Sequence, residues 1–275
     1  MSITPRIIPT VPYDSSRAFA DNRKVSTVCH NENLDVPVHI ERPYKLWSKL
    51  IAEFIGSILL VYIGSSQAVT SGNLLNSALA HGLTVSVLVS SLGQISGGHF
   101  NPAVTLAVLL CGKMKPMKAT FYIISQFLGG ILGSFLVSAT LSHHQFVQIA
   151  GGLTVTSTDY IWFQGLVCEI ILSFFLTQTV ILTAIDSTKT ALAPLAIGFT
   201  VCADILASGV VSGDSMNPAR SFGPAVVSSI IGIDRPLSFI WNHHYIFWIG
   251  PAIGACCTAL LYRSFLGRDE NRVFC

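Results

Sequence analysis

The sequence predicts an all-α membrane protein with six transmembrane helices and two re-entrant half-helices, arranged as an inverted repeat. Three observations indicate this fold class. Six stretches of the chain are apolar and long enough to cross a bilayer, two further apolar stretches are too short, and the two halves of the chain repeat each other. Hydrophobic residues make up 51% of the 275 residues and charged residues only 11%, which is too little charge for a soluble protein of this length.

The predicted spans follow from the thickness of the membrane. A hydrocarbon layer of roughly 30 Å needs about 20 mainly apolar residues in a helix. Stretches of this kind lie near residues 48–69, 75–95, 119–141, 161–184, 192–211 and 242–265. The two short apolar stretches, 101–111 and 217–231, predict half-helices that enter the membrane and return on the same side.

Residues of the first half recur in the second half at a shift of 116 positions. Glu53 falls on Glu169, and Asn101-Pro102-Ala103 falls on Asn217-Pro218-Ala219. Glu, Asn and Pro are rare at membrane depth, so shared apolar composition does not explain these matches. Each half contains three spans, an odd number, so the second copy enters the membrane from the opposite side. The two half-helices are therefore expected to point at each other.

The positive charges predict the orientation of the chain. Fourteen of the sixteen Lys and Arg residues fall on one side of the predicted spans: Arg6, Arg17, Arg23, Lys24, Arg42, Lys45, Lys49, Lys113, Lys115, Lys118, Lys189, Arg263, Arg268 and Arg272. Both termini are therefore expected to be cytoplasmic. The predicted organisation is a polar cytoplasmic tail at 1–46, a channel domain at 47–265 with half-repeats at about 47–141 and 161–265, and a short cytoplasmic tail at 266–275.

The Asn-Pro-Ala triplets have the chemistry that a half-helix needs at its start. The first N–H groups of a helix lack partners within the helix. Asn101 and Asn217 are good N-caps, and Pro102 and Pro218 suit the first helical position because proline has no N–H there. Each Asn amide can then offer a donor to a passing water, while both positive helix ends face the same point. This arrangement predicts water flow with exclusion of protons and cations.

The segments around the two triplets resemble the signature loops of the aquaporin (major intrinsic protein) family. They are Ser96–Thr105 (SGGHFNPAVT) and Ser212–Ala225 (SGDSMNPARSFGPA). The resemblance covers about residues 51–263. It implies the aquaporin hourglass fold, a homotetramer with one pore per subunit, and no cofactor. It also implies that Glu53 and Glu169 are the family's buried glutamates, which brace the half-helix loops.

The resemblance also assigns a selectivity filter. Arg220, at membrane depth, would cost about 2.5–3.5 kcal/mol unless it faces a wet cavity or a partner. Its position matches the family's aromatic/arginine constriction, and the other constriction positions map to His81, Ile205 and Asp214. The ring of His, Ile and Arg is similar to that of the ammonia-permeable animal aquaporins (aquaporin eight, ammoniaporin) and of some plant tonoplast aquaporins. A ring without a bulky aromatic is expected to be wider than a strict water filter.

Asp214 departs from the subgroup pattern, which has a small residue at this position. Its counterpart in the first half is Gly98. One hypothesis is that only the backbone carbonyl of Asp214 lines the pore, while the carboxylate turns outward to pair with Arg220 or solvent. The other is that the carboxylate intrudes on the filter and changes its charge. We favour the first.

These features predict a passive water channel that also passes ammonia and hydrogen peroxide and excludes protons and ions. The alternatives are a channel mainly for ammonia, peroxide or urea with minor water flux, and an ion-coupled secondary transporter. Ser221 stands where glycerol-conducting relatives usually carry Asp, which disfavours glycerol. No residue pattern indicates an enzyme, a metal site or nucleic-acid binding. The expected partners are the lipid bilayer, small neutral solutes and further copies of the chain, and the plasma membrane is favoured over an intracellular membrane.

Overall fold

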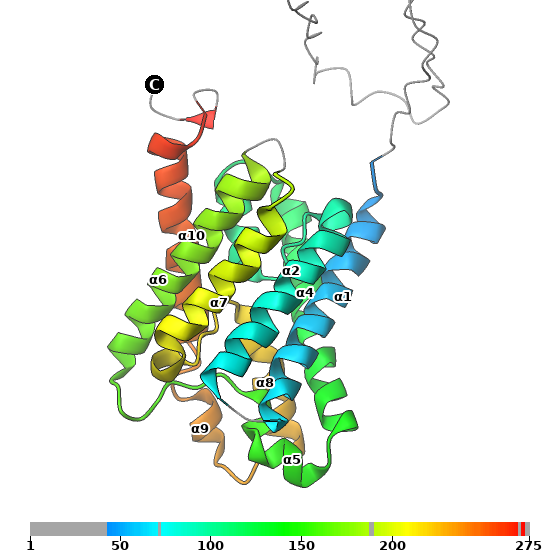
Figure 1. The fold of residues 1–275 in the computed structure, drawn as a ribbon, viewed down its shortest axis with the longest axis vertical. Coiled ribbons are helices and arrows are strands. Elements are labelled where there is room, and N and C mark those ends of the chain that lie inside the picture. The colour runs from blue at the N-terminus through cyan, green and yellow to red at the C-terminus, as the bar shows by residue number, and fades with distance from the viewer. Residues whose placement is uncertain (1–42, 71–72, 187–189, 269–270, 273–275) are drawn as a thin grey trace, which may run out of the picture. The chain divides into compact units, whose positions relative to one another are not determined.

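Six helical stretches are long and apolar enough to cross a membrane in the computed structural model, which describes residues 43–70, 73–186, 190–268 and 271–272. They are Leu46–Val69, Leu74–Ser96, Pro116–Thr140, Trp162–Ile185, Ala193–Ser212 and Leu237–Leu266. The six predicted spans are thereby confirmed. Most of the tail predicted at 1–46 lies outside the described residues. The described residues from Tyr44 onward belong to one compact unit (Figure 1).

The elements follow the predicted repeat. The first half contains α1 (Leu46–Ser66), the 3-10 turn η2 (Gln67–Val69), α2 (Leu74–Ser96), the half-helix α3 (Pro102–Leu110) and α4 (Pro116–Thr140). The second half contains α6 (Trp162–Val180), the π-helical turn η4 (Ile181–Ile185), α7 (Ala193–Ser212), the half-helix α8 (Pro218–Ile231), α9 (Leu237–Trp241), α10 (Ile246–Leu261) and the π-helical turn η5 (Tyr262–Leu266). The connection between the halves contains α5 (His143–Gln148) and the 3-10 turn η3 (Ala150–Gly152).

Helices α2 and α7, which are counterparts in the repeat, cross at a pair of equivalent glycines. A Cβ atom on Gly82 would lie 2.5 Å from the carbonyl oxygen of Gly198, and a Cβ atom on Gly198 would lie 2.4 Å from that of Gly82. A side chain at either position would clash with the other backbone, so the two glycines allow the helices to pack closely. Small residues at such crossings are a common means of packing membrane helices.

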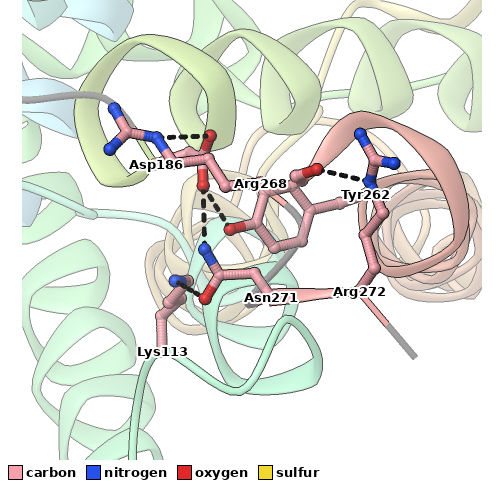
Figure 2. Close-up of polar contacts among 7 residues, drawn as sticks. Lys113, Asp186, Tyr262, Arg268, Asn271 and Arg272 are labelled. Atoms are coloured by element: carbon pink, nitrogen blue, oxygen red, sulfur yellow. Dashed lines mark hydrogen bonds and ion pairs between the residues drawn. The ribbon is translucent and has the colours of Figure 1, made fainter. Parts of the chain in front are cut away.

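The beginning of α1 and the end of α10 lie at the same end of this unit (Figure 1). Polar contacts fasten the described part of the C-terminal segment there, as Figure 2 shows. Asp186 accepts hydrogen bonds from Tyr262 Oη at 2.6 Å and from Asn271 Nδ2 at 3.4 Å, and Lys113 Nζ donates to Asn271 Oδ1 at 2.6 Å. Asp186 also lies 3.9 Å from Arg268 Nε. These contacts link the C-terminal segment to the ends of α3 and η4.

Candidate functional site

The two half-helices begin at the Asn residues of the triplets, as predicted. Asn101 caps α3, and its Oδ1 accepts a hydrogen bond from the N–H of Ala103 at 2.8 Å. Asn217 caps α8, and its Oδ1 accepts from the N–H groups of Ala219 at 3.0 Å and Arg220 at 3.2 Å. Proline occupies the start of each half-helix. Each half-helix thus has its first backbone N–H groups bonded by its own Asn cap, and its proline contributes no N–H that would need a partner.

Each Asn amide also reaches across to the opposite loop. Asn101 Nδ2 donates to the carbonyl of Met216 at 2.8 Å, and Asn217 Nδ2 donates to the carbonyl of Phe100 at 2.9 Å. These reciprocal hydrogen bonds hold the two half-helix starts against each other. An amide nitrogen carries two N–H groups, so one on each Asn remains for the cavity that both side chains line.

Two buried carboxylates brace the loops that precede the half-helices. Glu53 accepts hydrogen bonds from the N–H groups of His99 at 3.0 Å and Phe100 at 2.7 Å. Glu169 accepts from those of Ser215 and Met216, both at 2.8 Å. Phe100 and Met216 have φ of 48° and 50°, a region that non-glycine residues rarely occupy. The carboxylates therefore satisfy backbone groups in two strained turns that are equivalent in the repeat.

One narrow cavity of about 50 Å³ brings the predicted pore residues together. Both halves of the chain contribute to its lining, which includes His81, Asn101, Ile205, Asp214, Asn217 and Arg220. His81 and Ile205 come from α2 and α7, which are counterparts in the repeat, while Asp214 precedes and Arg220 begins the second half-helix. The residues that the sequence placed in one filter are thus neighbours in the structure.

Arg220 is held by two side chains. Its Nη1 donates to Thr154 Oγ1, and its Nη2 lies 3.3 Å from His81 Nε2. His81 Nδ1 lies 2.9 Å from the carbonyl oxygen of Ser77, which can only accept, so we assign the His81 proton to Nδ1. Nε2 is then an acceptor for Arg220. Thr154 was not found by sequence reasoning, because it lies in the connection between the halves and has no counterpart in the repeat.

Asp214 does not make the pairing that we favoured from the sequence. The side chain is 4% exposed, and neither carboxylate oxygen has a hydrogen-bond partner within the described part of the chain. It therefore turns neither to solvent nor into a hydrogen-bonded pair with Arg220. Its φ is 46°, and that of its counterpart Gly98 is 67°. The left-handed turn, which the first half makes with glycine, directs the carboxylate into the protein.

A family model described as major intrinsic protein matches residues 41–262. The chain belongs to the major intrinsic protein family. It is 39% identical to Aquaporin-8 of Notomys alexis over 81% of this chain and 84% of that protein. It is 38% identical to Aquaporin TIP1-2 of Musa acuminata over 80% of this chain and 88% of that protein. The X-ray structure of the aquaglyceroporin from Plasmodium falciparum aligns with a TM-score of 0.70 at 22% identity, covering 81% of this chain and 97% of that chain.

Membership of the family confirms the resemblance on which the filter assignment rests, and the structural alignment confirms the hourglass fold. Family membership and the six apolar spans together show that the protein is an integral multi-pass membrane protein and a passive channel for water and small solutes. Members of this family are channels and not enzymes.

Two glycines make room for side chains of the predicted filter in this major intrinsic protein. A Cβ atom on Gly64 of α1 would lie 2.4 Å from His81 Nε2, and one on Gly209 of α7 would lie 2.6 Å from Asp214 Oδ2. Sequence reasoning did not identify either glycine as part of the site. Neither belongs to the signature loops, and their role becomes visible only when the helices are packed.

Proposed function

We propose that the protein is a passive water channel that also passes ammonia and hydrogen peroxide and excludes protons and ions. The observation that supports this proposal most strongly is the meeting of two Asn-capped helix starts at one cavity. Each Asn amide there retains one N–H after bonding to the opposite loop. A water at this point can accept two hydrogen bonds through its oxygen, and both of its own hydrogens then point away along the pore.

Proton exclusion follows from this orientation. A proton moves along a water file only if each water can accept from one neighbour and donate to the next. The central water accepts from the two Asn residues instead, so the chain of transfers is interrupted. The positive ends of α3 and α8 also raise the energy of any cation between them.

We propose that His81, Ile205, Asp214 and Arg220 form the selectivity filter. The charge of Arg220 at membrane depth is expected to need a wet cavity or a partner, and it lines the pore cavity while bonding to Thr154. Ile205 and His81 leave the ring without a phenylalanine or tryptophan, which supports passage of solutes somewhat larger than water. The relatives named Aquaporin-8 and Aquaporin TIP1-2 support a water pore in this chain as well.

The remaining parts of the proposal concern assembly and placement. We propose a homotetramer with one pore in each subunit, a channel domain at 47–265, and cytoplasmic tails at 1–46 and 266–275. The positive charges support this orientation, since Lys113 and Arg268, which are far apart in the sequence, both lie at the end of the bundle where Asn271 and Asp186 meet. We favour the plasma membrane as its location.

Stopped-flow light scattering on proteoliposomes tests the solute range. Water, ammonia, hydrogen peroxide, urea and glycerol are compared in one preparation, with empty vesicles as the control. The proposal predicts fast flux of the first three and little flux of glycerol. Fast ammonia or urea flux with water flux close to that of empty vesicles would favour the alternative channel. Saturable flux that depends on an ion gradient would favour a secondary transporter.

A further inference from the structure

A second cavity of the described chain lies beside the pore, and we call it the side pocket. Its volume is about 300 Å³, at the lower end of the range of about 300–1,000 Å³ that small-molecule sites have. Its lining residues come from 154–160, in the connection between the halves, and from 238–247, which include α9 and the start of α10. It shares no lining residue with the cavity between the half-helices, so a solute held there does not lie in the water path.

Residues 154–160 form one wall of the side pocket, and the rest of the channel holds this wall in place. Thr154 Oγ1 accepts a hydrogen bond from Arg220 Nη1. The N–H of Ser157 donates to the carbonyl of Val211, near the end of α7, at 3.1 Å. Because the wall is fixed by these bonds, the pocket is preformed, and binding of a ligand requires little ordering of the chain.

The lining of the side pocket is polar and carries no fixed charge. None of its lining residues is Asp, Glu, Lys or Arg. Thr158, Tyr160 and Ser238 are exposed residues of the lining, and their hydroxyl groups make no hydrogen bond within the described part of the chain. A hydroxyl group can donate one hydrogen bond and accept two. The three hydroxyl groups therefore match a ligand whose own polar groups both donate and accept.

Two aromatic rings add a flat apolar surface to the same pocket. Tyr160 and Phe239 line it, and each is 37% exposed. Such a ring can pack against the C–H groups of a ligand, and Tyr160 offers a hydroxyl group at its edge as well. A charged ligand would find no opposite charge on these walls. A wholly apolar ligand would cover the hydroxyl groups and leave them without hydrogen bonds, which is costly.

We propose that the side pocket is a binding site for a neutral, polyhydroxylated ring, which is the chemistry of a monosaccharide. The hydroxyl groups of the ligand exchange hydrogen bonds with Thr158, Tyr160 and Ser238, while its C–H groups pack on Tyr160 and Phe239. The site lies at the end of the described unit that carries α9, opposite the start of α1 (Figure 1). The ligand is held beside the pore and is not a transported solute.

Titration of the purified channel with glucose, followed by saturation-transfer difference NMR, tests the proposal. The detergent is an amine oxide, because a detergent with a sugar head group would compete for the site. Ser238→Phe fills the pocket from α9, and Tyr160→Ala removes one hydroxyl group and one ring. Tyr245→Ala is the matched control, because Tyr245 is 40% exposed, lies close to α9 in the sequence and does not line the pocket. Gel filtration and water flux verify that each variant is folded, since none of the three residues lines the pore cavity.

The proposal predicts saturable binding of glucose, with the same dissociation constant in the unmodified protein and in Tyr245→Ala. Tyr160→Ala should raise the dissociation constant about tenfold, because one hydrogen bond and one ring contact are lost, and Ser238→Phe should abolish binding. Absence of binding to the unmodified protein, or equal binding to all four forms, would overturn the proposal.

Water flux with glucose at equal concentration on both sides of the membrane locates the bound sugar relative to the pore. A site beside the water path predicts the same flux with and without glucose. A fall in flux would place the sugar in the pore and would overturn the separate site. Binding is measured without any flux, so its failure would leave the proposed channel untouched.

Discussion

The two half-helix loops of this channel share one backbone arrangement, but they present different side chains to the cavity. Glu53 and Glu169 bind equivalent N–H groups, and Ser96 and Ser212 accept from the N–H groups of Gly98 and Asp214 at 3.0 Å and 3.3 Å. At the shift of 116 residues, each proposed filter residue has a counterpart that lines the same cavity. The counterparts of His81, Ile205, Asp214 and Arg220 are Ile197, Val89, Gly98 and Val104.

The counterpart positions are apolar or glycine, while three of the four filter positions are polar or charged. This difference separates two tasks. The repeated elements build the scaffold, and both copies are needed because each Asn bonds to the other loop. Solute discrimination, by contrast, needs only the one ring of proposed filter residues. Asp214 and Arg220 stand where the first loop has Gly98 and Val104, so both ionisable side chains that the half-helix loops contribute to the cavity lining at these positions come from the second copy.

The loops also differ in the side chains that hold them in place. In the first loop, Gln126 Nε2 donates to Glu53 at 2.8 Å, and Tyr122 Oη donates to the carbonyl of Ser96 at 2.7 Å. In the second loop, Ser215 and Ser221 form a hydroxyl pair, and the buried carboxylate of Asp214 has no partner within the described part of the chain. Each glutamate also accepts a third hydrogen bond, from Gln126 in the first loop and from Ser212 Oγ in the second, so the two copies are braced to a similar extent by different side chains.

Removing either glutamate brace is expected to have the largest effect. Glu53→Ala or Glu169→Ala would leave two buried N–H groups without an acceptor, at about 1–3 kcal/mol each. Because the braces are equivalent, we expect both variants to lower the midpoint of SDS-induced unfolding by a similar amount and to abolish most water flux. A loss confined to one variant would show that the two loops are not equivalent scaffolds.

Replacing the filter arginine by its first-half counterpart is expected to have the next largest effect. Arg220→Val copies Val104 into the filter and leaves the carboxylate of Asp214 without a compensating charge. Uptake of methylammonium by proteoliposomes should rise about tenfold, since about 1.4 kcal/mol of lost repulsion corresponds to that factor. The double variant Arg220→Val with Asp214→Gly should remove the rise. Equal uptake in the single and double variants would argue against charge compensation.

Filling the space beside His81 is expected to have a moderate effect. In Gly64→Ala the new Cβ atom would meet the His81 ring, which Ser77 holds from the other side, so the ring must shift into the cavity. We expect water flux to fall by about threefold, as for less than 1 kcal/mol of added barrier. Gly93→Ala is the matched control, because its Cβ atom would meet only Val89 Cγ1 at 3.5 Å. Similar losses of water flux in both variants would mean that any alanine in these helices lowers the flux, and not a shift of His81.

The smallest effect is expected at Thr154. Thr154→Val keeps the shape of the side chain but removes the acceptor of Arg220 Nη1. The guanidinium should become less well oriented, so the formamide-to-water permeability ratio should change by about twofold with little change in stability. Thr156→Val serves as the control, because Thr156 lies in the same connection and makes no hydrogen bond to Arg220 within the described residues. A ratio that stays constant would show that Arg220 is positioned without Thr154.

The spans and half-helices could be predicted because their signals are local. Hydropathy and length identify a span, and Asn followed by Pro identifies a helix start. The repeat supplied the long-range information, since it related residues 116 positions apart. The meeting of Asn101 and Asn217 followed from it.

Features outside the repeat could not be predicted. Thr154 lies in the connection between the halves, so no spacing rule linked it to Arg220. The short helix α9 (Leu237–Trp241) was not predicted either, because it precedes the expected final span at 242–265 and five residues are too few to give a hydropathy signal of their own. The direction of Asp214 depends on a left-handed turn that composition does not show.

Osmotic water permeability measured at several temperatures tests the central claim most directly. Purified protein in proteoliposomes is compared with empty vesicles of the same lipid by stopped-flow light scattering. A pore formed by the two Asn-capped half-helices predicts a shrinkage rate several-fold above that of empty vesicles, with a lower activation energy. A rate and an activation energy equal to those of empty vesicles would contradict a water channel.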